Sequence, residues 1–331
     1  MTMVSAFDRR YARMRTLVDR RLALLSRGAG PRTMTEACRH VLQGGGKRVR
    51  STLVLLSCEA VGGRAGNAVD AGAAVELLHN FTLVHDDIMD RATSRRGRPT
   101  VHTKWNQNVA LLAGDILLGM GYERLLSTRG ANAAALTGVY TRGLLDVCRG
   151  QGLDMEFEQT NRVSVRQYFT MIELKTARLL ATSTELGARI GGGTPAEIRA
   201  LRTFGRHLGI AFQLNDDLLD VIGEERDFGK AIGGDIVEGK KTFLYLTALA
   251  RASRRDAAIL RASVRKNKAR SARTRVKTVT GLYRTYDVTR AARDAIQRET
   301  NAACAALHVL RPGSARDMLT WFADRLVSRT S

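Results

Sequence analysis

The chain has 331 residues, of which 44% are apolar and four are proline, a composition that fits a globular, helix-rich protein. Charged residues interrupt the long apolar runs, so no segment approaches the roughly 20 residues of a membrane-spanning helix. The four cysteines lie far apart and form no Cys-x-x-Cys pair, which indicates neither a disulfide framework nor a zinc site and favours reduced thiols in a cytoplasmic protein.

The net charge of +21 is the unusual feature of this composition. Eleven Lys and Arg residues stand against a single Asp between Arg251 and Lys277. Such a segment suits an anionic membrane surface or nucleic acid, but it also suits a solvated helical face, which we favour. No interleaved aromatic residues and no zinc or RNA-binding motif accompany it, so we expect no nucleic acid partner.

Residues 1–30 carry apolar side chains at three- and four-residue spacing, which predicts one amphipathic helix. The arginines of this segment resemble those of an import signal. Asp8 and Asp19 argue against that interpretation, because such signals are poor in acidic residues.

A glycine-rich basic segment, Gly44–Arg50, separates two helical patterns. Glycines let the backbone approach a phosphate closely, and Lys47 and Arg50 supply a point charge and a bidentate fork. By itself the pattern is a weak signal, since a turn between two helices has the same composition.

A mostly apolar helical pattern over residues 75–90 ends in Asp86, Asp87 and Asp90. Asp86 and Asp90 lie one helical turn apart, and His79 lies on nearly the same face. Crowded carboxylates repel one another unless a cation lies between them, and oxygen ligands without cysteine favour Mg²⁺, which usually shares its coordination with substrate phosphates. For a lone cluster, a solvated acidic helix end is the simpler interpretation.

Residues 171–180 place Lys175 inside a mostly apolar helix. A buried lysine is costly unless it is paired, so its ammonium group either reaches solvent or meets an anion.

The spacing of the first aspartate cluster recurs at Asp216, Asp217 and Asp220, and Gln213 shares their helix face. Two clusters, each at the end of a helix, predict a cleft that holds several metal ions between them. Beyond the second cluster, residues 227–242 form a glycine-punctuated loop that carries Lys230 and Lys240. A flexible basic loop suits a lid over a phosphate, although an ordinary surface loop explains the composition as well.

These motifs resemble those of the trans-isoprenyl diphosphate synthases, also called polyprenyl synthetases. The matching motifs span about residues 44–242 in the same order, and they include Arg95-Arg96-Gly-Arg-Pro-Thr100 and Gly239-Lys-Lys-Thr242. The chain departs from the family pattern at Ser51, where a proline is usual.

The resemblance implies an all-α fold, an isoprenoid synthase-type bundle of antiparallel helices around a deep central cavity. We expect one domain over residues 1–331 and a homodimer.

The resemblance also implies the reaction, a head-to-tail (1′-4) condensation of isopentenyl diphosphate with an allylic diphosphate. Three Mg²⁺ ions would be held by the six aspartates and would bind the allylic diphosphate. The residues that assist them there would be Arg95, Lys175, Lys230 and Lys240. Isopentenyl diphosphate would be held by Lys47, Arg50, His79 and Arg96. Thr176 and Gln213 would place oxygen dipoles near the allylic cation.

Product length in this family depends on the residues just before the first aspartate cluster, here Phe81 and Thr82. The resemblance implies that Thr82 leaves the upper cavity open and that Phe81 closes it at the geranylgeranyl length. A helical wheel places Thr82 near the aspartate face and Phe81 well away from it, so a longer polyprenyl product is the main rival and a farnesyl product a weaker one.

Three other functions remain open. Class I terpene cyclases share an aspartate-rich first motif, but they lack a repeat of it and an isopentenyl site. A non-catalytic subunit of a heteromeric synthase is disfavoured by two complete clusters. A nucleic-acid-binding protein would have to rest on the basic charge alone.

Overall fold

Helices make up almost all of the regular structure, as the resemblance implies. The computed structural model describes residues 6–26, 28, 30–128, 131–160, 162–223, 233–264 and 271–327. Within these ranges the only strands form a two-stranded antiparallel ribbon, β1 (Ser94–Arg95) and β2 (Arg98–Pro99). The all-α fold class is confirmed. None of the described helices is both long and apolar enough to cross a membrane.

The structure falls into two compact units, and each has its own packing. The first comprises Met1–Leu144, Leu179–Thr203 and Leu307–Trp321, and the second comprises Leu145–Arg178, Phe204–Ala306 and Phe322–Ser331. The single domain with one deep central cavity stays a prediction.

The first unit is built from the N-terminal helices and from two later segments of the chain. Its elements are α1 (Ala6–Leu25), α2 (Arg32–Leu42), α3 (Val49–Ala60), the 3-10 turn η1 (Ala65–Ala68), α4 (Val69–Met89), α5 (Val101–Lys104), α6 (Gln107–Leu126), most of α9 (Arg178–Ile190) and the 3-10 turn η3 (Leu307–Val309). Besides α9, whose first residue Arg178 belongs to the second unit, three helices contribute residues to both units: α7 (Ala133–Gln159), α10 (Pro195–Ile222) and α17 (Ser314–Val327).

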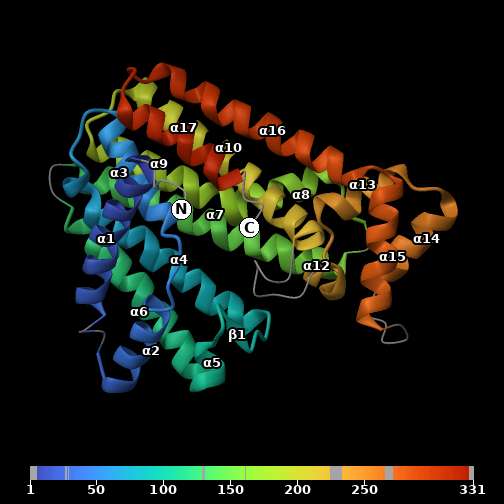
Figure 1. The fold of residues 1–331 in the computed structure, drawn as a ribbon. Coiled ribbons are helices and arrows are strands. Elements are labelled where there is room, and N and C mark those ends of the chain that lie inside the picture. Colours follow the sequence, from blue (N-terminus) through green and yellow to red (C-terminus); the bar gives the residue numbers. More distant parts are fainter. Residues whose placement is uncertain are drawn as a thin grey trace. The chain divides into compact units, whose positions relative to one another are not determined.

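Helix α4 is the central helix of the first unit and lies beside α6 (Figure 1). Small residues allow this close packing. A Cβ atom on Gly72 would lie 2.9 Å from Leu55 Cδ1 on α3, and one on Gly121 of α6 would lie 2.2 Å from the Tyr140 hydroxyl oxygen. That hydroxyl donates a hydrogen bond of 3.0 Å to the Ala74 carbonyl on α4. The helix that carries the first aspartate cluster is therefore held from two sides.

The second unit contains the remaining helices around its own apolar core. They are α8 (Val165–Ile172), the π-helical turn η2 (Glu173–Ala177), α12 (Gly234–Glu238), α13 (Phe243–Arg251), α14 (Arg254–Ser263), α15 (Ala272–Thr285) and α16 (Val288–Ala306). Buried side chains of α8, α10, α13 and α15 form this core, among them Tyr168, Leu214, Leu244 and Tyr283. Burial of several large apolar side chains stabilises the unit by about 1.5–3 kcal/mol for each of them.

Two sequence expectations are met by single elements. The amphipathic helix expected within residues 1–30 is α1, which buries Met14, Val18 and Leu22. The loop of residues 227–242 contains α12 in its second half, while Lys230 lies outside the described residues.

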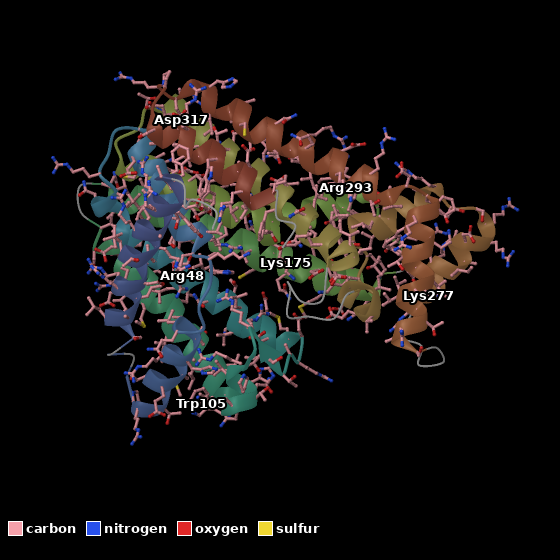
Figure 2. All side chains as sticks on the ribbon, viewed as in Figure 1. Arg48, Trp105, Lys175, Lys277, Arg293 and Asp317 are labelled. Carbon is pink, nitrogen blue, oxygen red and sulfur yellow. The ribbon has the colours of Figure 1, made fainter. Side chains whose placement is uncertain are left out.

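The described parts of the basic segment, residues 251–264 and 271–277, have the pattern of an amphipathic helical surface. Helices α14 and α15 bury Leu260 and Val279 and leave Arg261 and Lys277 exposed. Lys277 is labelled in Figure 2. These helices therefore meet the unit through an apolar face and present a charged one outward, as expected for a solvated face.

Candidate active site

The glycine-rich loop between α2 and α3 adopts left-handed backbone conformations at three residues. Their φ angles are 74° at Gly45, 140° at Gly46 and 49° at Arg48. A Cβ atom on Gly46 would lie 3.0 Å from Arg96 Nη1, and the same nitrogen donates a hydrogen bond to the Gly45 carbonyl. The glycines thus make room for the guanidinium of Arg96, a role that the sequence pattern did not show.

Arg48 fixes this loop from inside the first unit (Figure 2). Its buried guanidinium donates to Asp19 Oδ1 on α1 at 2.8 Å, to the Leu42 carbonyl of α2 at 2.8 Å, and to Glu76 Oε2 on α4 at 3.2 Å. The other Glu76 oxygen accepts from the Ser51 backbone N–H at 3.3 Å. A proline at position 51 could not donate that bond. Sequence reasoning missed this network, although an acidic residue inside an apolar run, Glu76, is the signal for it.

Lys47 and Arg50 flank Arg48 on the two sides of the loop. The Lys47 side chain is exposed, and its carbonyl accepts a hydrogen bond from the Tyr11 hydroxyl. Arg50 Nη1 donates to His79 Nε2 on α4 at 3.2 Å. Burial, together with the charges of Arg50 and Arg96, holds the pKa of His79 well below its usual value, so the imidazole is neutral. The first unit therefore brings Arg50 and His79 together beside the loop that Arg96 contacts.

The β1–β2 ribbon presents Arg95 and Arg96. Its turn has positive φ at both central residues, 53° at Arg96 and 72° at Gly97, which is the mirror-image turn that matches strand twist. Arg95 Nε donates to Asp87 Oδ1 at 2.7 Å. Asp87 is only 5% exposed, and burial raises its pKa even though Arg95 acts in the opposite direction. A non-glycine residue in this conformation costs about 1 kcal/mol or more, so the surrounding contacts must hold Arg96 in it.

The first aspartate cluster ends α4 as predicted, but its members have different environments. The Asp90 backbone N–H donates to the Asp86 carbonyl at 2.8 Å, so the helical turn continues to the last carboxylate. Asp86 is partly exposed and Asp90 is exposed, whereas Asp87 is buried against the ribbon. The helix face therefore offers its two outer carboxylates and uses the middle one internally.

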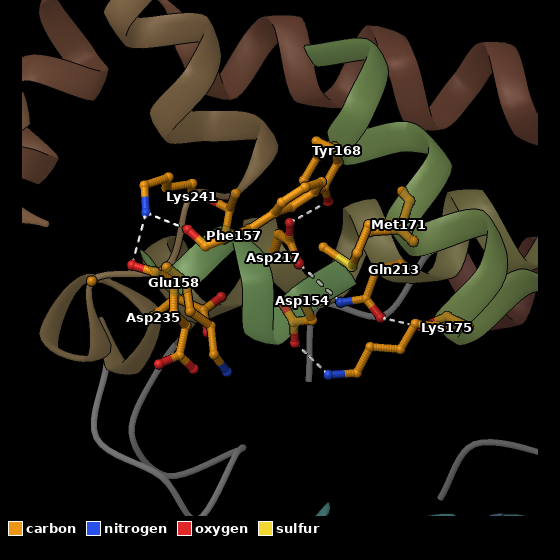
Figure 3. Close-up of a pocket in the computed structure, with 15 residues that line it drawn as sticks. Asp154, Phe157, Glu158, Tyr168, Met171, Lys175, Gln213, Asp217, Asp235 and Lys241 are labelled. Atoms are coloured by element: carbon orange, nitrogen blue, oxygen red, sulfur yellow. Dashed lines mark hydrogen bonds and ion pairs between the residues drawn. The ribbon is translucent and has the colours of Figure 1, made fainter. Parts of the chain in front are cut away.

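In the second unit, a cavity of about 100 Å³ is lined by five of the residues predicted for the allylic site (Figure 3). Lys175, Thr176, Gln213, Asp217 and Lys240 line it. Three residues that sequence reasoning did not assign line it as well: Asp154, Tyr168 and Asp235.

A chain of hydrogen bonds crosses this cavity. The Thr176 hydroxyl donates to Gln213 Oε1 at 2.8 Å, and Gln213 Nε2 donates to Asp217 Oδ1 at 2.9 Å. The Tyr168 hydroxyl donates to the other Asp217 oxygen at 2.5 Å. Burial and the nearby Asp235 raise the pKa of Asp217 to about 7. Like Asp87 in the first unit, the middle aspartate of the second cluster is buried and bonded to protein donors.

Lys175 lies in the π-helical turn η2, and π-turns inside helices often occur at functional sites. Its ammonium donates to Asp154 Oδ2 at 2.5 Å, which confirms that a lysine in this apolar helix meets an anion. A Cβ atom on Gly150 of α7 would lie 2.2 Å from the Lys175 backbone nitrogen. The glycine thus lets α7 touch the backbone of the turn.

Lys240 and Asp220 meet around α12. Lys240 Nζ lies 3.5 Å from Asp235 Oδ1 and 2.8 Å from Glu238 Oε2. Asp220 Oδ2 accepts from the Asp235 backbone N–H at 3.1 Å, and burial together with Asp235 raises the pKa of Asp220 to about 6. The raised pKa values of Asp217 and Asp220 reflect buried negative charge that a cation would stabilise.

The carboxylates fit Mg²⁺ in the manner that this ion prefers. Among the residues that the structure describes, no three His, Cys, Asp or Glu side chains already converge as a complete metal site. Mg²⁺ is usually bound by one or two carboxylates together with waters and substrate phosphates, so a preformed protein cage is not required. The donor set at the two helix ends is of this kind.

Comparisons with known proteins identify the family. A family profile described as Polyprenyl synthetase matches residues 31–281. The chain belongs to the polyprenyl synthetase family. All the motifs that carried the resemblance, from Gly44 to Thr242, lie inside the matched range. The predicted enzyme class, a trans-prenyltransferase, is confirmed.

Relatives and solved structures agree over nearly the whole chain. The chain is 38% identical to the short chain isoprenyl diphosphate synthase of Methanothermobacter thermautotrophicus over 322 residues, which cover 97% of each protein. It is 42% identical to the geranylgeranyl diphosphate synthase of Sulfolobus acidocaldarius over 218 residues, 65% of this chain and 66% of that protein. The crystal structure of geranylgeranyl pyrophosphate synthetase from Pyrococcus horikoshii has a TM-score of 0.92 at 35% identity, covering 98% of this chain and 100% of that one.

Proposed function

We propose that this protein condenses isopentenyl diphosphate head to tail with an allylic diphosphate and that its main product is geranylgeranyl diphosphate. The observation that carries the proposal is the pair of aspartate-bearing helix ends, each accompanied by lysines or arginines, in a member of this family. Several relatives bear the name geranylgeranyl diphosphate synthase, which supports the product.

We assign isopentenyl diphosphate to the first unit. Lys47, Arg50, His79 and Arg96 are the proposed contacts. The exposed Lys47 supplies a point charge, and Arg50 and Arg96 supply forks that match two phosphate oxygens each. The neutral His79 would act as a hydrogen-bonding group, because the arginines around it suppress its protonation.

For the allylic diphosphate we propose Arg95, Lys175, Lys230 and Lys240 as protein cations and three Mg²⁺ ions as partners. Bound Mg²⁺ would supply positive charge at the leaving oxygens and so lower the barrier to ionisation. The outer aspartates of each cluster, Asp86, Asp90, Asp216 and Asp220, are the proposed direct ligands.

The middle aspartates take a different part in this proposal. Asp87 orients Arg95, and Asp217 orients Gln213, whose amide in turn receives the Thr176 hydroxyl hydrogen. The Thr176 oxygen keeps its lone pairs for the allylic cation that forms when the diphosphate leaves. Because its hydroxyl hydrogen is donated to Gln213, Thr176 would stabilise the cation as a dipole.

Product length is assigned to Phe81, with Thr82 above it. Phe81 is 9% exposed and contacts the His85 ring on the same helix, whereas Thr82 is partly exposed and its hydroxyl donates to the His79 carbonyl at 2.8 Å. A buried ring on this helix suits a stop for a growing apolar chain. A longer polyprenyl product is the main alternative.

We also propose a homodimer in which α6 forms part of the contact. Leu111, Leu112 and Leu126 of this helix are between 41% and 58% exposed, which is unusual for large apolar side chains. Cytoplasmic location stays a prediction of the same kind. For the basic segment 251–277, a solvated face stays the favoured interpretation and contact with an anionic membrane the alternative.

The test is incubation of the protein with labelled isopentenyl diphosphate and, in turn, dimethylallyl, geranyl and farnesyl diphosphate in Mg²⁺. We expect all-trans geranylgeranyl diphosphate as the main labelled product. A hydrocarbon that has lost its diphosphate would indicate a cyclase, and no turnover with any allylic diphosphate would refute the proposal.

A further inference from the structure

His85 lies one residue before the first aspartate cluster and faces α6, away from the aspartate face. Its ring lies against Gly114 of α6 so closely that a Cβ atom on that glycine would be 2.3 Å from His85 Nε2 and 2.6 Å from Cδ2. Real Cβ atoms do not approach a ring to such distances, so this position of His85 requires glycine at residue 114.

A hydrogen bond fixes the orientation of the same ring. His85 Nε2 lies 3.2 Å from the Leu111 carbonyl oxygen, so this nitrogen carries the hydrogen and donates it. Asp115 Oδ1 lies 3.9 Å from the same nitrogen. Helix α6 thus fixes His85 through two contacts: the ring packs against Gly114, and the hydrogen bond to the Leu111 carbonyl sets the orientation of the ring.

The His85 ring also contacts Phe81. The two rings are one helical turn apart on α4, with centroids 4.7 Å apart and planes at 62°. Edge-to-face aromatic pairs of this kind contribute beyond their buried area and favour one ring orientation over others. Phe81 is therefore supported by His85, and His85 is supported by α6.

We propose that His85, seated on Gly114, is the positioning residue that holds the Phe81 ring in place and thereby sets the length at which the prenyl chain stops growing. The inference rests on the proposed function, because it concerns the product of that reaction. His85 does not touch the reacting atoms in this proposal, and its effect passes through Phe81.

The physical argument concerns rotamer freedom. A phenylalanine on a helix has two common χ1 positions, and a neighbouring ring that fills one of them restricts the side chain to the other. Without the His85 ring, Phe81 can turn into the vacated space beside Gly114. A growing apolar chain can then pass the position that Phe81 had closed.

Three variants of the full chain test this. His85→Ala removes the supporting ring, and Gly114→Ala displaces it, so both are expected to shift the main product upward by about one isoprenyl unit or more. Gly119→Ala is the matched control, because it lies on the same helix and a Cβ atom there meets nothing within 4 Å. Its product distribution is expected to match that of the wild type.

The double variant Phe81→Ala with His85→Ala decides whether His85 acts through Phe81. The inference predicts the same product distribution for the double variant as for Phe81→Ala alone. An additive further lengthening would overturn it, as would an unchanged distribution in His85→Ala when Phe81→Ala lengthens the product.

The readout separates this inference from the proposed function. Product length is measured only on variants that fold and turn over. A lower total rate in Gly114→Ala therefore leaves the comparison of product length between His85→Ala and the wild type intact. If the wild type makes no prenyl diphosphate, the proposed function fails. If the wild type makes it and the His85 and Gly114 variants keep its length, only the present inference fails.

Discussion

Replacement of Glu76 by glutamine would test how the glycine-rich loop of residues 44–50 is held. Both Arg48 and Glu76 are buried, with side chains 5% and 4% exposed and a contact of 3.2 Å between Nη1 and Oε2. Glutamine keeps the shape and an acceptor for Ser51 but removes the charge that compensates Arg48.

The expected loss follows from what Arg48 retains. Removal of one partner of a buried ion pair costs about 3–5 kcal/mol, because the remaining charge stays buried without compensation. Arg48 keeps the Leu42 carbonyl and Asp19, whose side chain is 41% exposed, so the lower end of that range, about 3 kcal/mol, applies. For a chain of 331 residues this corresponds to a fall in Tm of about 4 °C.

Two assays measure the effect. Thermal unfolding followed by circular dichroism gives the change in Tm, and steady-state kinetics gives the KM for each substrate. Arg48 follows Lys47 in the chain and anchors the loop that carries it. We therefore expect the KM for isopentenyl diphosphate to rise more than that for the allylic substrate. The control is Glu36→Gln, which removes an exposed partner of Arg32 and should leave Tm unchanged. A Tm for Glu76→Gln equal to that of the control would refute the argument.

Four further predictions concern other parts of the structure. Asp86→Ala or Asp216→Ala should lower turnover by orders of magnitude with helical circular dichroism retained, and chelation of the metal should lower turnover reversibly. Activity of either variant near that of the wild type in Mg²⁺ would contradict the metal assignment. Lys47→Ala should raise the KM for isopentenyl diphosphate more than that for the allylic diphosphate, and an equal effect on both would contradict the separation of subsites. Gly150→Ala places a Cβ atom 2.2 Å from the Lys175 backbone nitrogen and should cost about 1–3 kcal/mol of stability, whereas Gly152→Ala, where a Cβ meets nothing within 4 Å, should not. Burial and nearby arginines hold the pKa of His79 well below 6.5, so the folded protein binds fewer protons at His79 than the unfolded chain does. The free energy of unfolding therefore decreases as the pH falls below 6.5 toward the folded pKa. His79→Gln should flatten that part of a Tm-against-pH profile, and an unchanged slope would count against a neutral His79.

Features that depend on neighbours along one helix follow from the sequence alone. Spacing alone put Asp86 and Asp90 on one face at the end of α4, and the structure has them one turn apart. The amphipathic pattern of residues 1–30 likewise predicted α1 and its buried face. The order of the motifs was enough to indicate the family, because each motif is a local pattern.

The partners of these side chains depend on how distant segments pack together. Periodicity gives the direction of a residue around its helix axis but not what lies opposite, so the burial of Asp87 against Arg95 and of Asp217 against Tyr168 could not be read from spacing. The same holds for Lys175, whose anion, Asp154, comes from another helix.

Gly46 and Glu76 show the same limit of sequence patterns, which do not identify a distant partner. The sequence indicated that Gly46 permits a close approach, but the group that approaches, the guanidinium of Arg96, is 50 residues further along the chain. Glu76 broke an apolar run without an evident reason until Arg48 was placed beside it. A buried charge is tolerated only where a distant segment supplies its counter-charge, and that pairing is a property of the packed structure.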